Sequence, residues 1–234
     1  MNSKKHDTAE IFDSYRNNYS DTVDDAIAFT GLKTDFFTRV KADYIVDIVR
    51  GHFGRQLVDA LDIGCGVGNY HQHLAPTFQS LSGVDISSAC IETARRCNPF
   101  QSYQTYEGDR LPHPDASFDV AFAICVLHHV PVADWHGFVR EMRRILRPNG
   151  LALIFEHNPG NPLTMRAVNN CPFDADAVLL RAKETEQLME AAGFDDVASR
   201  AILSVPAAGQ FLRAVDRLFA RLPFGAQYYV RGTA

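Results

Sequence analysis

No stretch of the 234-residue sequence approaches the roughly 18 consecutive apolar residues of a membrane-spanning helix. The first residues, MNSKKHD, pass directly from charged to polar side chains and lack the apolar segment of a secretory signal. Basic charge is also scarce, because 23 Lys and Arg stand against 28 Asp and Glu, for a formal net charge of −5. Proteins that bind nucleic acid usually carry a basic surface. We therefore expect a cytoplasmic protein without a membrane or nucleic-acid partner.

Cysteines are few, and none has a metal-binding spacing. The sequence contains five of them and no Cys-x-x-Cys pair, which argues against both a disulfide framework and a zinc ribbon. We expect them to be small buried hydrophobic residues. The pairs His71/His73 and His128/His129 lack both the spacing and the neighbouring acidic residues of a metal site. The sequence therefore predicts no bound metal.

What the sequence does contain is an alternation of short apolar runs and helical patterns. This alternation is typical of a parallel sheet with crossover helices. A connecting stretch, 19–31, is expected to separate the first two helices. The expected strands cover residues 57–63, 81–84, 100–106, 118–125, 151–155, 197–203 and 228–230. The expected helices cover residues 7–18, 35–50, 69–75, 87–97, 135–146 and 184–192, with a further helical stripe over 211–219.

The clearest of these helices, 135–146, has apolar residues at positions i, i+3, i+4 and i+7. Asp134 is expected to cap its start, and Pro148 prevents its continuation. The arginines opposite the apolar stripe are expected to form a solvated face, and they are Arg140, Arg143, Arg144 and Arg147.

The strongest motif is DIGCGVG at residues 62–68, at the end of the first expected strand. Alternate glycines permit backbone angles closed to other residues and let a ligand approach the main chain closely. Asp85 ends the second strand, 21 residues after Gly64, where an acidic side chain can accept hydrogen bonds from ribose hydroxyls. These two features also fit a nicotinamide dehydrogenase, but the dinucleotide fingerprint would place a third glycine where the chain has Asn69.

Further motifs bring the chain close to one family. Gly108-Asp109 follows the third strand, SFD at 117–119 opens the fourth, and GVDIS at 83–87 and RILRPNG at 144–150 complete the set. In combination with the glycine loop, they resemble class I S-adenosylmethionine (SAM)-dependent methyltransferases, particularly small bacterial enzymes that act on small molecules. The resemblance covers roughly residues 57–156. A narrower likeness to a bacterial branch of that family extends through 156–162, 171–174 and 225–228.

The resemblance implies a Rossmann-like, doubly wound α/β fold with a mostly parallel seven-stranded sheet. It implies one methyltransferase domain over 1–234, with an N-terminal helical cap at 1–50 and a SAM-binding core with a C-terminal extension at 51–234. Asp85 would then hold the ribose, Asp109 the adenine amine and the Cys125 region the ammonium group. The cofactor would be SAM, released as S-adenosylhomocysteine. The residues implied for its site are Asp62, Gly64, Cys65, Gly66, Asn69, Asp85, Ile86, Gly108, Asp109, Arg110 and Cys125.

The candidates for the chemistry lie at the expected carboxyl ends of strands, where acceptors bind. A hydroxyl acceptor must lose its proton as it attacks, and His128, His129, Glu156 and His157 are the candidate bases. We favour His128, with Glu156 and His157 shaping the acceptor site. The alternative is that such a histidine only orients a loop. The cap is expected to bring Tyr15 and Tyr19 to the acceptor.

The sequence thus predicts methyl transfer to a small-molecule acceptor, through oxygen or nitrogen, in secondary or specialised metabolism, by a monomer or homodimer. Two alternatives remain open. One is a nucleotide-dependent oxidoreductase, and the other is a catalytically silent SAM-binding module that acts through a partner.

Overall fold

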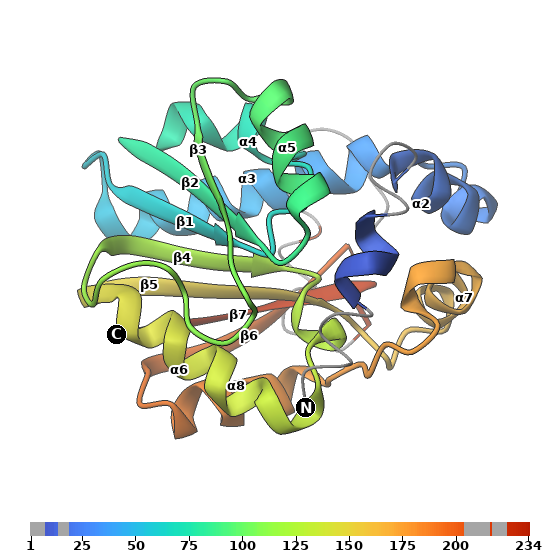
Figure 1. Ribbon diagram of the computed structural model, residues 1–234. Helices are drawn as coiled ribbons and strands as arrows, with labels where there is room; N and C mark the ends of the chain where they lie inside the picture. The colour runs from blue at the N-terminus through green and yellow to red at the C-terminus, as the bar shows by residue number, and fades with distance from the viewer. Residues whose placement is uncertain (1–7, 14–18, 204–215, 217–223) are drawn as a thin grey trace.

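The computed structural model describes residues 8–13, 19–203, 216 and 224–234, and a seven-stranded sheet forms its centre (Figure 1). The strand order is β3-β2-β1-β4-β5-β7-β6, and neighbouring strands from β3 to β5 are parallel. β7 runs antiparallel to both β5 and β6, so the sheet is mostly parallel, as predicted. The strands are β1 (Asp59–Ile63), β2 (Ser80–Asp85), β3 (Ser102–Thr105), β4 (Phe118–Ile124), β5 (Leu146–His157), β6 (Asp195–Ile202) and β7 (Gln227–Thr233).

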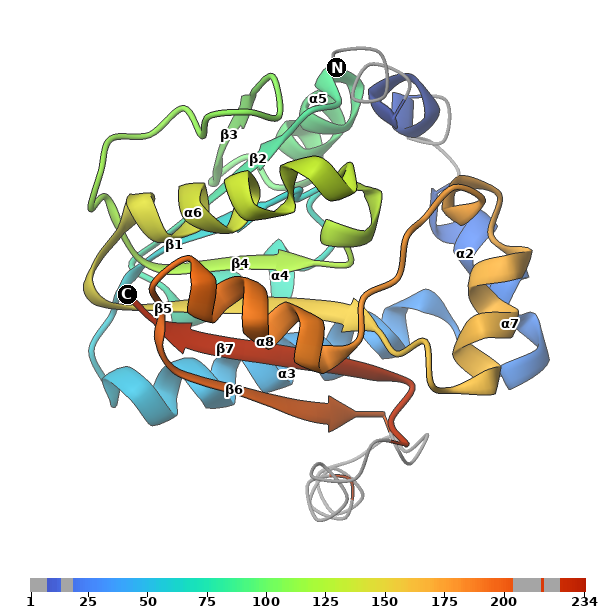
Figure 2. The ribbon, with the colours of Figure 1, turned by 90° about the horizontal axis from the view of Figure 1, so that it is seen from below.

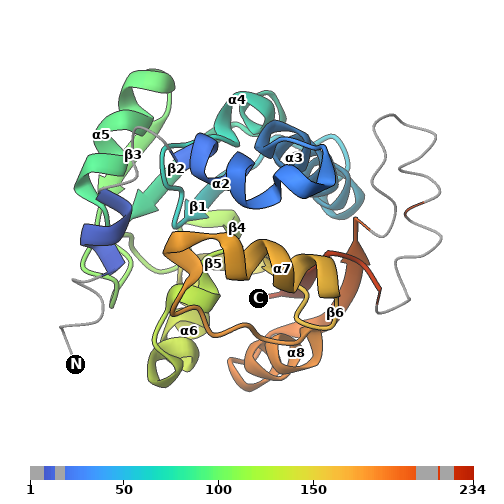
Figure 3. The same ribbon diagram turned by 90° about the vertical axis from the view of Figure 1, so that its right-hand side faces the viewer.

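Helices cover both faces of this sheet because its central strands are apolar on both sides. In β4, Phe122 packs with α3, and its neighbour Ala123 packs with α6 on the opposite face. Figure 3 shows α3 and α4 on one side and α6 and α8 on the other. The helices are α3 (Thr34–Phe53), α4 (His71–Leu74), α5 (Ser88–Cys97), α6 (Trp135–Ile145) and α8 (Ala182–Ala191).

The strand order reverses beside β1, which positions the functional edge of the sheet. The chain fills positions on one side of β1 with β2 and β3, then crosses to β4 and β5 on the other side. The connections that leave the carboxyl ends of β1 and β4 therefore diverge, and a crevice opens between them. The glycine motif and the histidine pair both lie at this edge.

α6 has the predicted apolar stripe, but two expectations about its polar residues were wrong. Asp134 ends the preceding η4 (Val132–Asp134), and its side chain makes no capping hydrogen bond. The arginines do not form a simple solvated face either. Arg144 bonds to Glu141 and to the backbone carbonyls of Leu111 and His113, so it holds the segment before β4 against the helix.

Two helices that the sequence patterns did not predict cover the carboxyl edge of the sheet. α2 (Tyr19–Ile27) lies within the stretch expected to be a connection, and α7 (Pro162–Asn170) follows β5. They lie side by side (Figure 2), with the Arg166 guanidinium 4.5 Å from the centroid of the Phe29 ring. α3, which was expected to belong to the N-terminal cap at 1–50, packs on a face of the sheet instead. Of that expected cap, only the described residues before Thr34 lie over the carboxyl edge of the sheet.

Most of the remaining predicted elements match the described chain within a few residues, although β5 begins five residues before the strand predicted at 151–155. Of the helix predicted at 7–18, residues 8–13 are helical and the rest lie outside the described residues, as does the stripe at 211–219 apart from Asp216. Asp216 is buried, and its carboxylate accepts hydrogen bonds from the Tyr44 hydroxyl and the Leu203 backbone N–H. Among the helices of the described segments, none is both long and apolar enough to cross a bilayer.

Candidate active site

The turn after β1 brings glycine backbone to the edge of a cavity. Gly64 and Gly66 have φ angles of +74° and +52°, in the left-handed region that glycine adopts without steric cost. A Cβ atom on Gly64 would lie 2.5 Å from the Val126 side chain, whereas one on Gly66 would meet no atom within 4 Å. Open space therefore lies beside Gly66, where a ligand can approach the main chain.

Asp85 stands beside this turn at the end of β2. Its carboxylate accepts hydrogen bonds from the backbone N–H groups of Gly66, at 2.8 Å, and Ser87, at 2.9 Å. Burial raises the pKa of Asp85 to about 6, although these two N–H donors oppose the rise. The carboxylate lines the cavity and can accept further hydrogen bonds from the hydroxyls of a ribose.

The raised pKa of Asp85 predicts a pH dependence of SAM binding if Asp85 holds the ribose, as the resemblance implies. The ribose hydroxyls would then donate to the ionised carboxylate, and protonation of Asp85 would remove the acceptor. We expect the Kd for SAM to rise as the pH falls through about 6, approaching about tenfold per pH unit. Calorimetric titration between pH 5 and 8 measures this. Asp85→Asn should bind weakly with little pH dependence, and a parent Kd unchanged across the range would contradict the prediction.

A chain of hydrogen bonds between buried polar side chains lies next to the glycine turn and holds it in place. Asp62 bonds to His71 at 3.1 Å, and the other nitrogen of His71 lies 2.6 Å from the Tyr103 hydroxyl. His71 is fully buried, and each of its ring nitrogens has a protein partner, Asp62 or Tyr103. Asp62 therefore acts through β1 and α4 to fix the turn, in addition to facing the cavity. His71 and Tyr103 were not among the predicted site residues.

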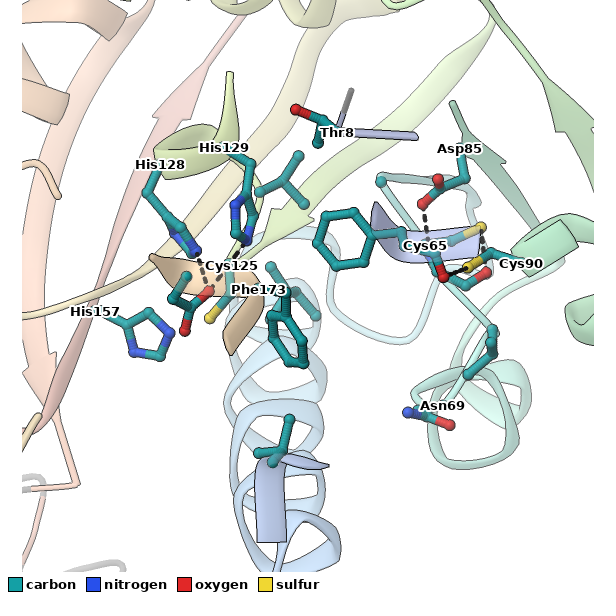
Figure 4. A pocket seen from close by; sticks show the side chains of 18 of the residues that line it. Thr8, Cys65, Asn69, Asp85, Cys90, Cys125, His128, His129, His157 and Phe173 are labelled. Atoms are coloured by element: carbon teal, nitrogen blue, oxygen red, sulfur yellow. Dashed lines mark hydrogen bonds and ion pairs between the residues drawn. The ribbon is translucent and has the colours of Figure 1, made fainter. Parts of the chain in front are cut away.

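The cavity encloses about 250 Å³ and runs from the glycine turn to the segment after β4 (Figure 4). Asp109 and Arg110 are exposed and are not among its walls, and Arg110 lies 3.9 Å from Asp115. The other residues implied for the cofactor site all line it, namely Asp62, Gly64, Cys65, Gly66, Asn69, Asp85, Ile86, Gly108 and Cys125.

Ionisable side chains gather at the opposite end of the cavity, where Figure 4 shows His128, His129 and His157 close together. The histidine pair belongs to η3 (Leu127–His129), directly after β4. It was expected to lack acidic neighbours, but the fold supplies two. Glu156 lies 2.5 Å from His128 Nδ1, and Asp174 lies 3.3 Å from His129 Nε2 and 3.7 Å from His128 Nε2.

Glu156 is 1 % exposed and does not line the cavity. One carboxylate oxygen accepts hydrogen bonds from the backbone N–H groups of Val126 and Leu127, and the other lies against His128. Burial would raise the pKa of Glu156, but His128 lowers it below its usual value, so Glu156 is an ionised acceptor. This geometry makes Glu156 a residue that positions His128 and its turn.

The two neighbouring histidines differ in charge. Burial opposes protonation of His128, yet the carboxylates of Glu156 and Asp174 raise its pKa well above the usual value. Burial and, next, the charge on His128 lower the pKa of His129 to about 3. A charged and a neutral imidazole therefore stand next to each other, with ring centroids 4.1 Å apart.

Lys41 and Cys125 form a second pair in the cavity wall, and Lys41 was missed from the sequence. The Lys41 ammonium is 3.7 Å from Cys125 Sγ, and no carboxylate of the described residues lies within 4.0 Å of it. Burial alone would raise the pKa of the Cys125 thiol, but Lys41 and His157 lower it to about 7. The signal in the sequence was a lysine among the mostly apolar residues on the buried side of α3. A buried ammonium group of this kind suits an anionic group of a ligand.

The cap supplies apolar wall to the same cavity. Phe12 and Phe173 pack against each other with ring centroids 5.7 Å apart, and both line the space beside His129. Tyr19 begins α2, and Tyr15 lies outside the described residues, so their expected contact with the acceptor stays a prediction.

Comparisons with known proteins agree on one family. Residues 61–154 match the family model described as a methyltransferase domain. The chain is 35% identical over 101 residues to a demethylmenaquinone methyltransferase of Tropheryma whipplei (strain Twist), covering 42% of this chain and 41% of that one. It is also 35% identical over 96 residues to a tRNA (carboxymethyluridine(34)-5-O)-methyltransferase of Saccharomyces cerevisiae, covering 41% and 34%. The matched segments thus span less than half of these relatives' lengths.

A solved structure extends the likeness to the whole chain. It is a SAM-dependent methyltransferase from Thermotoga maritima described as a possible histamine N-methyltransferase, with a TM-score of 0.67 and 19% identity over 96% of this chain and 98% of that one. At this identity the likeness supports the shared fold. The domain match over 61–154, the relatives and the sheet topology together make this chain similar to the class I SAM-dependent methyltransferases.

Proposed function

We propose that this chain transfers the methyl group of SAM to an oxygen or nitrogen atom of a small molecule. The observation that supports the proposal is one continuous cavity whose two ends are lined by chemically different groups. Gly66 and Asp85 stand at one end, and the cluster around His128 stands at the other. A methyltransferase needs this arrangement because donor and acceptor must meet in line in a space that excludes water.

The residues at the first end fit the cofactor. Gly66 leaves its backbone open, Asp85 offers a carboxylate to the ribose, and Lys41 offers an ammonium to an anionic group. SAM supplies, when bound, a methyl group already activated by its sulfonium charge. The roles of Asp109 at the adenine and of the Cys125 backbone at the ammonium group remain part of this proposal.

The second end is suited to hold and orient an acceptor. Glu156 fixes His128 through Nδ1, so that Nε2 is directed toward Asp174 and the cavity. His157 completes this end, held by Gln227 at 3.2 Å. Because Glu156 and Asp174 raise the pKa of His128 and keep it protonated, we assign His128 the role of binding the acceptor through a hydrogen bond from Nε2–H, in place of the base role favoured from the sequence, and Glu156 a positioning role.

His128→Ala tests the acceptor end. We expect turnover to fall by about 100-fold, because an acceptor misplaced by about 1 Å from the methyl group reacts about that much more slowly. The measurement is transfer of labelled methyl from SAM to fractions of a small-molecule extract, with SAM affinity measured in parallel. The matched control is His73→Ala, at an exposed histidine of α4, which should leave turnover unchanged. Near-normal turnover in His128→Ala would remove this residue from the mechanism.

The tRNA enzyme among the relatives makes RNA the rival acceptor. The net charge of −5 argues against an RNA-binding surface, and the apolar wall formed by Phe12 and Phe173 suits a small molecule. Labelled SAM offered with total tRNA and with the small-molecule fraction separates the two. Label in tRNA would overturn the small-molecule proposal, and label in neither fraction would favour the silent SAM-binding module.

A further inference from the structure

Three side chains at the acceptor end have the donor set of a metal site. One nitrogen from each of His128 and His129 and one oxygen of Asp174 lie within 4.8 Å of one another. The Asp174 oxygen is 3.7 Å from His128 Nε2 and 3.3 Å from His129 Nε2. Ligands about 2.1 Å from one ion lie roughly 3.0–3.4 Å apart in octahedral or tetrahedral geometry. The two distances to Asp174 therefore need only a small contraction, or none, around a cation.

The neighbour of His128 prepares it for this role. Glu156 holds the Nδ1 side of the ring, which leaves Nε2 to face the other two donors. A carboxylate that accepts the second ring N–H of a histidine ligand is the usual support of such ligands, because it fixes the tautomer and raises the basicity of the ligating nitrogen. His128 therefore has the support expected of a metal ligand.

The two turns that carry the donors are tied to each other. Val178 N–H donates to the His128 carbonyl, which anchors the segment after η5 (Pro172–Asp174) beside η3. The Trp135 indole N–H lies 3.0 Å from the Leu127 carbonyl and 2.9 Å from the Val130 carbonyl, so the turn that carries both histidines is fixed from a second side. Prearranged donors of this kind lower the entropic cost of binding an ion.

Against the expectation from the sequence, we propose that His128 Nε2, His129 Nε2 and Asp174 Oδ1 bind a divalent transition-metal ion such as Zn²⁺. Two imidazoles and one carboxylate suit this class of ion. All three residues line the cavity, so the remaining coordination positions face the acceptor space. Resting on the proposed function, and with the ion in place of the Nε2 proton of His128, this assigns the acceptor class: a small molecule with an oxygen donor, such as a hydroxyl, that completes the coordination.

The competing account is that the cluster is only an imidazolium held between carboxylates. It predicts no affinity for metal ions beyond that of surface histidines. The metal site predicts one tight site, lost when either His129 or Asp174 is changed. These two accounts differ in metal binding itself, so no substrate is needed to separate them.

The experiment titrates the chelator-treated, dialysed full-length chain with Co²⁺ and records its visible absorption, followed by displacement with Zn²⁺. We expect one equivalent of Co²⁺ in a low-symmetry site and an increase in Tm with Zn²⁺. His129→Gln and Asp174→Asn should weaken binding at least about 100-fold, and the control His136→Ala, at an exposed histidine of α6, should not. Circular dichroism and SAM titration show that each variant is folded.

The proposal is overturned if the parent gives no Co²⁺ spectrum and no Zn²⁺ stabilisation, or if the two variants bind as the parent does. SAM binding and methyl transfer are measured on the same samples. A chain that binds SAM but no metal removes the metal site alone. A chain that binds metal but transfers no methyl group removes the proposed function alone.

Discussion

Replacing Glu156 with alanine is expected to lower the free energy of unfolding by about 3–5 kcal/mol, because removal of one partner leaves a buried charge without its nearest counter-charge. The substitution takes from His128 its nearest carboxylate and leaves the backbone N–H groups of Val126 and Leu127 without their acceptor. For a chain of this length the loss corresponds to a fall in Tm of roughly 6–20 °C. Urea and thermal unfolding measure it.

Two further variants identify the source of this loss. Glu156→Gln keeps an oxygen that can accept from the two N–H groups but removes the charge, so it should lose less stability than the alanine variant. Glu190→Ala, at an exposed glutamate of α8, should change the unfolding free energy by less than about 0.5 kcal/mol. An alanine variant at 156 within 1 kcal/mol of the parent would show that the network contributes little.

Replacing Gly66 with valine is expected to raise the Kd for SAM at least about 100-fold, equivalent to about 2.7 kcal/mol. The new side chain would project into the cavity, since a Cβ atom there meets no protein atom within 4 Å. It would therefore occupy the space where the cofactor approaches the backbone. Calorimetric titration with SAM and with S-adenosylhomocysteine measures the loss.

The control for Gly66→Val must separate obstruction from backbone strain. Gly31 has a φ of +70°, close to the +52° of Gly66, and its Cβ would also meet nothing, but it does not line the cavity. Gly31→Val therefore carries a similar strain without blocking the site. We expect it to lose stability and retain SAM affinity. Equal loss of SAM affinity in both variants would show that backbone strain, and not obstruction of the cavity, lowers the affinity.

Local sequence patterns were sufficient to predict an element when its own residues show how it is buried. The period of α6 and the apolar run of β4 predicted both elements, because a helix stripe and a two-sided strand each have a signature within about a dozen residues. α2 and α7 were not predicted because each has only nine residues and packs against the other at the edge of the sheet, so neither has a long pattern of its own. The Asn161 side chain caps α7 just before Pro162, a signal that was present and unused.

The sequence by itself predicted most of the residues that line the proposed cofactor half of the cavity, since the glycines and Asp85 lie at strand ends within 24 residues, 62–85. Only the tertiary structure decided the acceptor half. It brings Lys41 to Cys125 across 84 residues, and it sets Glu156 and Asp174 against a histidine pair that lacks acidic neighbours in the sequence. The charge state of that pair follows from burial and from these carboxylates, which are properties of packing and not of local order.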